Sequence, residues 1–400
     1  MSYFTGAAFF QLSRVIGASF RLFLVAIVLD GFVLGPMGVP FAVTVAVTLL
    51  LIYLYTFRGG IQTVVYTDTL QTAAMLLAVG IAVHGILSAL DSSLLELPGL
   101  VQSSSLDQTF FFAGGWADDN NFFKQFGSGA LITIVMTGLD QDMMQKNLTC
   151  RNVGEAKKNV LSLAVLLVPI NLLFLVLGIL LYTYLQKQGI EVPQRADTVF
   201  PSIALQELSP VAGIAFIVGL VAAAYSSADS ALTSLTTSFC VDFLGFERRE
   251  ANDEVAQHEH RRTRSLVHVG FTVLLFLVIM AFYFINNESV INSLFRVAGL
   301  TYGPLLGLFA FGLFTRRRVN DRLVPAVAIA APLLSYFIDA NSVAWLAGFK
   351  FGFLLLALNG LLMFLGLLLI STPQSAPYTT GRPGESDGSF EDAAFAKTKG

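Results

Sequence analysis

Long apolar blocks limit what this 400-residue chain can fold into more than any other feature of its sequence. Blocks such as 160–181 and 266–284 contain no Asp, Glu, Lys or Arg. A helix needs about 20 such residues to cross the hydrocarbon of a bilayer. The blocks are apolar throughout, whereas the strands of a membrane barrel alternate apolar and polar residues. The sequence therefore predicts an all-α, polytopic membrane protein.

Apolar blocks of this kind divide the chain into one transmembrane domain, 1–370, and a polar tail. The tail, 371–400, is rich in Gly, Ser, Pro and acidic residues, a composition that predicts a disordered segment. The domain is expected to hold about ten spans, near 8–34, 38–57, 61–90, 126–148, 159–185, 210–243, 265–286, 290–314, 323–340 and 343–370.

The composition excludes several classes of protein. Hydrophobic residues make up 55% of the chain and charged residues 13%, and the mean hydropathy is +0.70. Soluble domains are about 45–50% apolar and about 25% charged. There is no nucleotide-binding loop, nucleophile elbow or zinc motif. We therefore expect neither an enzyme nor a partner of nucleic acids.

Lysine and arginine predict the orientation in the membrane. One set of alternate loops carries most of them, and the other carries only Lys124, Lys187 and Arg195. Loops rich in these residues stay in the cytoplasm. With an even number of spans, both chain ends are then cytoplasmic. We expect a multi-pass protein of the plasma (inner) membrane.

A polar cluster interrupts the span at 210–243. Ionisable side chains cost about 2.5–3.5 kcal/mol at the centre of a membrane on insertion scales, so each needs a partner or a water-filled cavity. Ser226, Ser227, Asp229 and Ser230 lie within two helical turns. Their oxygens suit sodium, which prefers oxygen ligands. The alternative is that the hydroxyls bond to their own helix or join neighbouring helices.

Two further acidic positions have open interpretations. Asp68, in the span at 61–90, could contact sodium, carry a proton or balance a cation such as Arg58. A group at the end of the span at 126–148 could form a gate or simply mark a helix end that meets water; it consists of Asp140, Gln141, Asp142 and Gln145.

Basic residues inside the spans are also informative. Arg296 suits a carboxylate or another planar anion. It could bind substrate or pair internally, with Asp30 as the candidate partner. Arg14, Arg21 and Lys350 lie near span ends, where snorkelling toward the interface accounts for them.

At these residues the chain resembles the sodium:solute symporter family. The blocks that carry the resemblance occur in the order of the family: GGIQTVVYTDTLQ at 59–71, DQDMMQK at 140–146, DTVFP at 197–201, AAYSSADS at 223–230 and TYGPLLG at 301–307. The resemblance implies two inverted five-helix repeats and sodium-driven alternating access.

The resemblance also implies where ions bind. The main sodium site of the family maps onto the carbonyl of Ala223 and the hydroxyls of Ser226 and Ser227. A second site, for sodium or a proton, maps onto Asp68 and Ser226 together with Asp229 and Ser230. Asp229 stands where family members with that site have serine, which adds a carboxylate.

Two departures from the family bear on the solute. Val135, Met136 and Thr137 stand where sugar-transporting members have aromatic gate residues, and their substrate glutamine falls on Arg296. With Arg296, Met136 and Thr137 as substrate residues, an anionic or zwitterionic solute is a better expectation than a sugar.

The family also places roughly three further helices before the segment that aligns with 13–19, completing its first repeat. We therefore expect an amino-terminally incomplete chain that retains half of each site. The predicted function is sodium-coupled symport of a small organic solute. The alternative is a membrane sensor or scaffold that keeps the transporter fold. The oligomeric state is left open.

Overall fold

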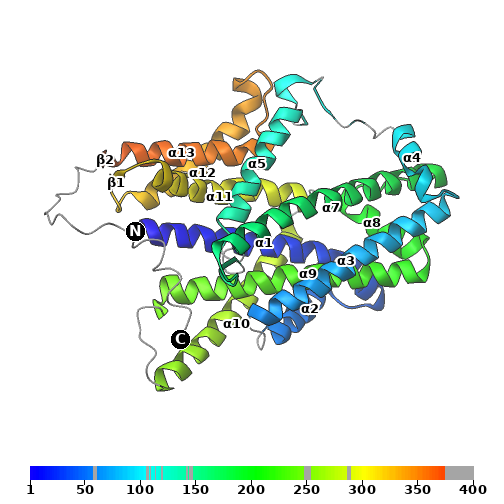
Figure 1. The fold of residues 1–400 in the computed structure, drawn as a ribbon, viewed down its shortest axis with the longest axis horizontal. Coiled ribbons are helices and arrows are strands. Elements are labelled where there is room, and N and C mark those ends of the chain that lie inside the picture. Colours follow the sequence, from blue (N-terminus) through cyan, green and yellow to red (C-terminus); the bar gives the residue numbers. More distant parts are fainter. Residues whose placement is uncertain are drawn as a thin grey trace.

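The computed structural model is a bundle of long helices (Figure 1). It describes residues 1–373 apart from 57–60, 105–107, 109, 113, 119, 141–142, 144–146, 247–253 and 286–289. The helices are α1 (Ser2–Leu29), α2 (Phe41–Thr56), α3 (Ile61–Ala89), α4 (Leu97–Ser103), α5 (Phe122–Gly138), α7 (Val153–Gln188), α8 (Val199–Ser202), α9 (Pro210–Ser238), α10 (Glu254–Ile285), α11 (Val290–Phe314), α12 (Val324–Trp345) and α13 (Leu355–Leu369).

Within the described residues, eight helices are long and apolar enough to cross a membrane. They belong to α1, α3, α7 and α9 to α13. The apolar part of α2 is shorter, and α5 has 17 residues. The prediction of an all-α, multi-pass membrane protein is confirmed, and within the described residues eight of the ten predicted spans coincide with helices of membrane-crossing length.

Two predicted spans have different limits in the structure. The span expected at 126–148 is α5, which ends at Gly138 because Leu139 leaves the helical conformation. The span expected at 343–370 becomes helical over α13 only from Leu355, since α12 continues to Trp345. Ala347 and Gly348 both have positive φ, at 51° and 87°, which turns the chain between the two helices. The sequence stays largely apolar through the end of α5 and through the turn between α12 and α13, so hydropathy alone does not reveal where these helices end.

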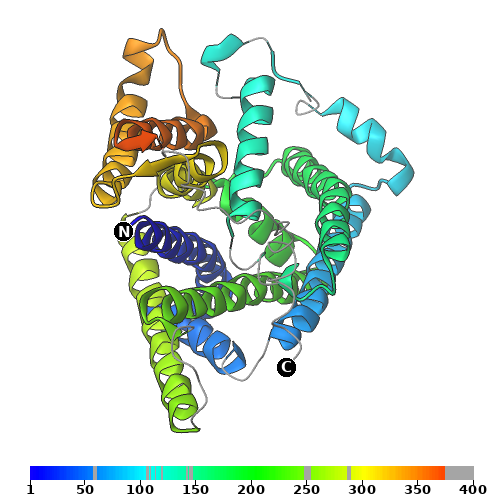
Figure 2. The same ribbon diagram turned by 60° about the vertical axis from the view of Figure 1, so that its left-hand side comes forward.

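Helix α1 lies inside the bundle (Figure 2). It packs against α9, α10 and α11, and its apolar side chains form the largest buried cluster together with those of α2, α9 and α10. Phe20 stacks on Phe282 of α10 with ring centroids 4.0 Å apart. Because α1 is enclosed, its charged side chains need a partner within the protein or a water-filled cavity.

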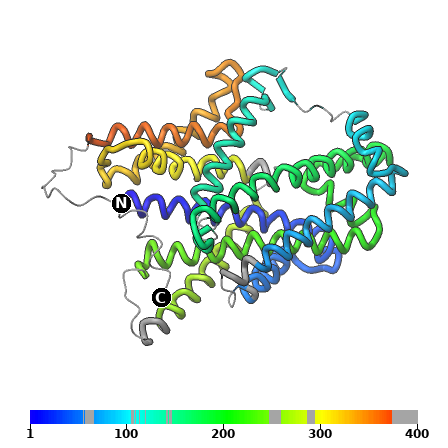
Figure 3. The backbone as a smooth tube through the Cα atoms, in the orientation of Figure 1, coloured from blue at the N-terminus to red at the C-terminus, as the bar shows by residue number. Residues whose placement is uncertain are grey.

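Helices α3 and α9 pack closely along much of their length (Figure 3). The sequence starts α9 with Ser209, whose side chain accepts a hydrogen bond from the Ala212 N–H, and with Pro210 at the first helical position. Gly219 allows the close approach, because a Cβ there would lie 2.6 Å from the Cβ of Ala78 on α3. This contact determines which polar residues of the two helices face each other.

Helices α11 and α13 make an equally close contact. Gly299, Gly303 and Gly307 recur every fourth residue on the face of α11 that meets α13. A Cβ at Gly307 would lie 2.5 Å from the Cβ of Met363. Glycines at this spacing let helix backbones approach in a membrane, where packing and hydrogen bonds drive association.

A buried asparagine completes this interface. Pro304 has no N–H, so the Leu300 carbonyl lacks its usual helical donor. Asn359 Nδ2 donates to that carbonyl oxygen over 2.7 Å and to the Gly299 oxygen over 3.1 Å. Asn359 is completely buried. One amide group thus satisfies the carbonyl that the proline leaves open.

Buried Lys124 anchors the amino-terminal end of α5. Its Nζ donates to three carbonyl oxygens, those of Trp116, Asp118 and Lys350, at 3.3, 3.0 and 2.7 Å. It also lies 4.4 Å from the ring centroid of Phe349. Since Phe349 and Lys350 belong to the α12–α13 connection, α5 is fastened to that connection.

A short two-stranded ribbon joins the α11–α12 connection to the residues after α13. Strands β1 (Arg317–Val319) and β2 (Ser371–Pro373) pair antiparallel, with Arg318 opposite Thr372. The first three residues of the tail predicted to be disordered are therefore ordered, because their backbone groups pair with the α11–α12 connection. The rest of the predicted tail, 374–400, lies outside the described residues.

The lipid-facing surface is clearest on α7. Leu161, Val165 and Leu175 are all exposed, and only 11% of the most apolar part of this helix is buried. A water-facing helix of this composition would expose a large apolar patch, whereas a lipid-facing helix satisfies its own backbone. The outer face of α7 fits contact with hydrocarbon.

The α11–α13 interface generates a stability prediction. We expect Asn359→Ala to lower the free energy of unfolding by about 1–3 kcal/mol, because it leaves the buried Leu300 carbonyl without a donor. Asn341→Ala is the matched control. Asn341 also donates to a helix carbonyl, that of Phe337, but the bond is exposed and no proline removes the helical donor. Denaturant titration in detergent would measure both variants, and equal losses would contradict the assigned role of Asn359.

Candidate functional site

A cavity of about 390 Å³ lies where α1, α3, α5 and α9 meet. It is the place where the polar residues of four helices face one another. Its lining comprises Arg14 and Arg21 from α1, Gln71, Thr72 and Met75 from α3, Met136 from α5, Asp140 and Met143 beyond α5, and Ala223, Ser226, Ser227 and Ser230 from α9.

Helix α9 presents its small polar residues to this cavity as one surface. Ser226 and Ser227 come three and four residues after Ala223, and Ser230 comes seven residues after it, so all four lie on the same side of the helix. Ser226 Oγ donates a hydrogen bond to Asp68 Oδ1 on α3 over 2.5 Å. The structure thus brings together Asp68, Ser226 and Ser230, which the sequence assigned to one site.

Two arginines of α1 form the opposite wall. Arg14 and Arg21 are seven residues apart, about two helical turns, so both lie on one side of α1. Arg21 Nη1 donates to Ser227 Oγ over 2.9 Å. Arg14 Nη1 lies 2.7 Å from Asp140 Oδ2, and only 7% and 11% of these two side chains are exposed. Both arginines were expected to be snorkelling anchors, and the structure instead places them inside the bundle.

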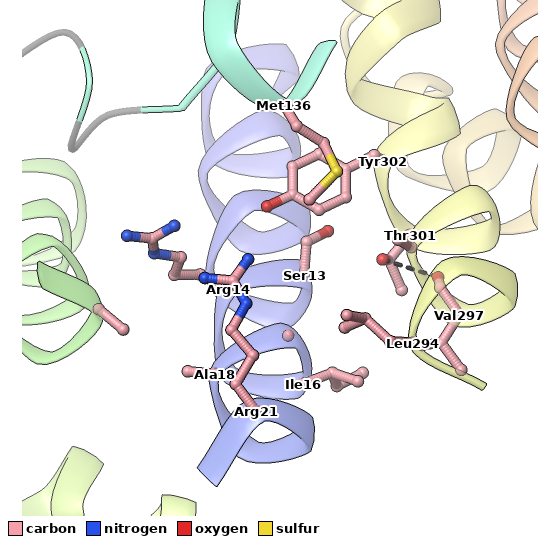
Figure 4. A pocket seen from close by; sticks show the side chains of 13 residues that line it. Ser13, Arg14, Ile16, Ala18, Arg21, Met136, Leu294, Val297, Thr301 and Tyr302 are labelled. Carbon is pink, nitrogen blue, oxygen red and sulfur yellow. Dashed lines mark hydrogen bonds between the residues drawn. The ribbon is translucent and has the colours of Figure 1, made fainter. Parts of the chain in front are cut away.

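A small pocket extends from the cavity toward α11 (Figure 4). It shares Arg14, Arg21 and Met136 with the cavity and adds Thr301 and Tyr302 of α11. Figure 4 shows the side chain of Arg21 running along α1 toward that of Arg14. The pocket holds about 10 Å³, roughly the space of one water molecule. The two arginines therefore separate a polar chamber from the packed interior.

Other residues proposed from the sequence lie elsewhere. Asp229 is 2% exposed and does not line the cavity, and its Oδ1 accepts a hydrogen bond from Thr233 Oγ1 over 3.4 Å. Thr137 follows Met136 but does not line the cavity. These two side chains are therefore not brought into the Ser226 group.

Arg296 lies outside the cavity on α11. Its Nη2 is 3.7 Å from Asp339 Oδ2 of α12, and its guanidinium carbon lies 5.9 Å from the ring centroid of Tyr336. About half of the Arg296 side chain is exposed. The structure thus gives it an internal partner, Asp339, in place of the expected Asp30.

The acidic group after α5 has a clearer role than the sequence suggested. Asp140 is buried and paired with Arg14. It is therefore more than a helix end that meets water. Gln141, Asp142 and Gln145 lie outside the described residues.

The sequence contains a signal for the inward-facing arginines that the predictions above did not use. Arg14 and Arg21 are seven residues apart, and this spacing places two charges on one face of an apolar helix.

The oxygen atoms in and beside the cavity suit a hard, singly charged cation. It offers the hydroxyls of Ser226, Ser227 and Ser230 and the nearby carboxylate of Asp68. Such oxygens replace the hydration shell of an alkali ion. Among the described residues no group of three His, Cys, Asp or Glu side chains could hold a metal ion. A transition-metal centre therefore has no support in the described part of the chain.

Comparison with known proteins gives consistent matches. A model of the sodium:solute symporter family matches residues 21–322. The chain is 27% identical over 338 residues to the sodium/sialic acid symporter NanT of Aliivibrio fischeri, covering 82% of this chain and 64% of that protein. It is 26% identical over 300 residues to the sodium/sialic acid symporter SiaT of Proteus mirabilis, covering 74% and 59%. It thus spans about three fifths of the length of these curated relatives.

The fold has a counterpart among solved structures. The structure of a Na⁺-coupled sialic acid symporter, in a substrate-bound outward-open state, matches with a TM-score of 0.72 at 19% identity. The match covers 92% of this chain and 73% of the other. At this identity the likeness supports the transporter fold, in agreement with the expected architecture.

The buried ion pair beside the cavity generates a prediction. We expect Asp140→Asn to lower the free energy of unfolding by about 3–5 kcal/mol, because it leaves the Arg14 charge buried without its carboxylate. Asp339→Asn removes the carboxylate from the half-exposed Arg296 pair and should cost about 0–1 kcal/mol. Denaturant titration of the two variants in the same detergent is the measurement. A loss as large for Asp339→Asn as for Asp140→Asn would be inconsistent with the difference in burial.

Proposed function

Because the chain belongs to the sodium:solute symporter family, we propose that it transports a small organic anion across the plasma (inner) membrane, coupled to sodium. The observation that carries this proposal is the cavity between α1, α3, α5 and α9. Oxygen ligands for a cation line one wall, and two guanidinium groups line the other. The family contains transporters rather than enzymes, which agrees with the absence of any enzymatic motif.

Sodium would bind at the α9 wall. The proposed ligands are the Ala223 carbonyl and the hydroxyls of Ser226 and Ser227, with Asp68 at the side. The carboxylate of Asp68 lies within hydrogen-bonding distance of Ser226 and adds the negative charge that favours a cation. Ser230 extends the same row of oxygens. The buried carboxylate of Asp229 remains a candidate for a second cation or a proton, outside this cavity.

The solute would bind at the α1 wall. Guanidinium groups present planar pairs of donors that match a carboxylate. Arg14 and Arg21 therefore favour an anionic or zwitterionic solute. Sialic acid, the solute that the names of NanT and SiaT give, carries such a carboxylate and is the first candidate. Met136 is the proposed apolar contact.

The membrane orientation is part of the same proposal. Most lysines and arginines outside the spans lie in one set of loops, which would face the cytoplasm together with both chain ends. The exposed apolar surface of α7 supports direct contact with lipid. Sodium and solute would then enter from the opposite side and move inward.

The sodium assignment is tested by uptake into proteoliposomes. We expect Ser226→Ala to raise the sodium concentration for half-maximal uptake of labelled sialic acid about tenfold, since a lost ligand worth about 1.4 kcal/mol changes affinity tenfold. Asp68→Asn should act in the same direction. Ser234→Ala is the matched control, because Ser234 lies on α9 but donates to the Ala231 carbonyl away from the cavity. Unaltered sodium dependence in both Ser226→Ala and Asp68→Asn would refute the site, and saturable binding without uptake would favour a sensor.

The solute assignment is tested by comparing two arginines. We expect Arg21→Gln to raise the KM for sialic acid about tenfold to a hundredfold. This change corresponds to losing a hydrogen bond to a charged group, which contributes about 1.5–3 kcal/mol. Arg296→Gln, which changes an arginine outside the cavity, should leave KM nearly unchanged. The reverse result would assign the anion to Arg296, as the sequence first suggested.

A further inference from the structure

We propose that Arg21 is a tethered cation that occupies the Ser227 hydroxyl until sodium displaces it. The inference rests on the proposed function and concerns how its two sites communicate. Arg21 Nη1 donates to Ser227 Oγ over 2.9 Å, so the side chain of the anion wall reaches across to the cation wall. The same hydroxyl is a proposed sodium ligand. One oxygen thus serves two cations in turn.

A sodium ion and the guanidinium group of Arg21 cannot both contact the Ser227 oxygen favourably at the same time. Arginine has five N–H donors and no acceptor, so it adds no ligand to the coordination shell of an ion. Its positive charge repels sodium, and the repulsion is stronger in a cavity of low dielectric than in water. Ser226, by contrast, contacts the carboxylate of Asp68. Its neighbour Ser227 instead accepts the hydrogen bond from Arg21.

Displacement would deliver the charge of Arg21 to the solute. Arginine stays protonated in proteins, so its charge cannot be removed and must find another partner. Arg14 lies two turns away on the same wall. A released Arg21 would therefore join Arg14 to form an anion site that is incomplete while Arg21 holds Ser227. Sodium and an anionic solute would then strengthen each other's binding, as reciprocal linkage requires.

The proposal is tested by equilibrium binding of radioactive sodium to the purified full chain without solute. We expect Arg21→Gln to tighten sodium binding about fivefold or more, the lower end of typical coupling between sites. Arg21→Lys keeps a positive charge and should stay close to wild type. Arg296→Gln is the matched control, because it removes the same group outside the cavity, and it should leave sodium affinity unchanged.

A double-mutant cycle distinguishes competition at Ser227 from general repulsion. We expect Ser227→Ala to weaken sodium binding, and Arg21→Gln to bring no comparable gain once Ser227 is alanine. Equal gains in both backgrounds would overturn the proposal, since the arginine would then act without the hydroxyl. Unchanged or weaker sodium binding in Arg21→Gln would overturn it as well.

The same assay separates this inference from the proposed function. Ser226→Ala should weaken sodium binding whether or not Arg21 competes. If it does so while Arg21→Gln brings no gain, the sodium site stands and the tethered-cation proposal fails. If sodium binds neither wild type nor Arg21→Gln, both fail. Elution as a single species in size-exclusion chromatography confirms that each variant is folded. Arg21→Met, which also removes the charge and should bring the same gain, replaces Arg21→Gln where that variant does not fold.

Discussion

Polar groups inside a bilayer must be satisfied by the protein itself, because the hydrocarbon contains no water. This constraint accounts for the contacts that organise the cavity. Asp68 contacts Ser226, Arg21 contacts Ser227, and Arg14 pairs with buried Asp140. Each contact joins two different helices or a helix to the segment after another. The residues proposed to bind ion and solute are therefore also the residues that hold four elements in register.

The same constraint shapes the other side of the bundle. Pro304 leaves the Leu300 carbonyl of α11 without its helical donor, and Asn359 of α13 donates a hydrogen bond to that carbonyl. The amide reaches that carbonyl only because Gly303 has no side chain, since a Cβ there would lie 2.3 Å from Asn359 Cγ. Close packing and hydrogen bonding are thus linked in one interface. Tyr302 and Thr301 of α11 in turn line the pocket beside the arginines.

The sequence predicted the helices well because hydropathy is a local property. It also predicted that Asp68 and Ser226 belong to one site, since their motifs resemble those of a known family. It did not reveal which way a basic side chain turns. Arg14 and Arg21 could snorkel or face inward, and the choice depends on neighbours such as Asp140 that are distant in sequence. Arg296 likewise met Asp339 instead of Asp30, because α11 packs on α12.

The two ends of α5 differ in how many described polar contacts hold them. At its amino-terminal end three carbonyl oxygens accept from one lysine, so Lys124 keeps two acceptors if it loses any one of them. At its carboxyl-terminal end the described anchor to α1 is the Arg14–Asp140 pair beside the cavity. A ligand that drew Arg14 away would remove this ion pair and leave the Lys124 hydrogen bonds in place. Without that pair, α5 would remain attached at Lys124 and through the packing of Val135 on Tyr302 and Leu356.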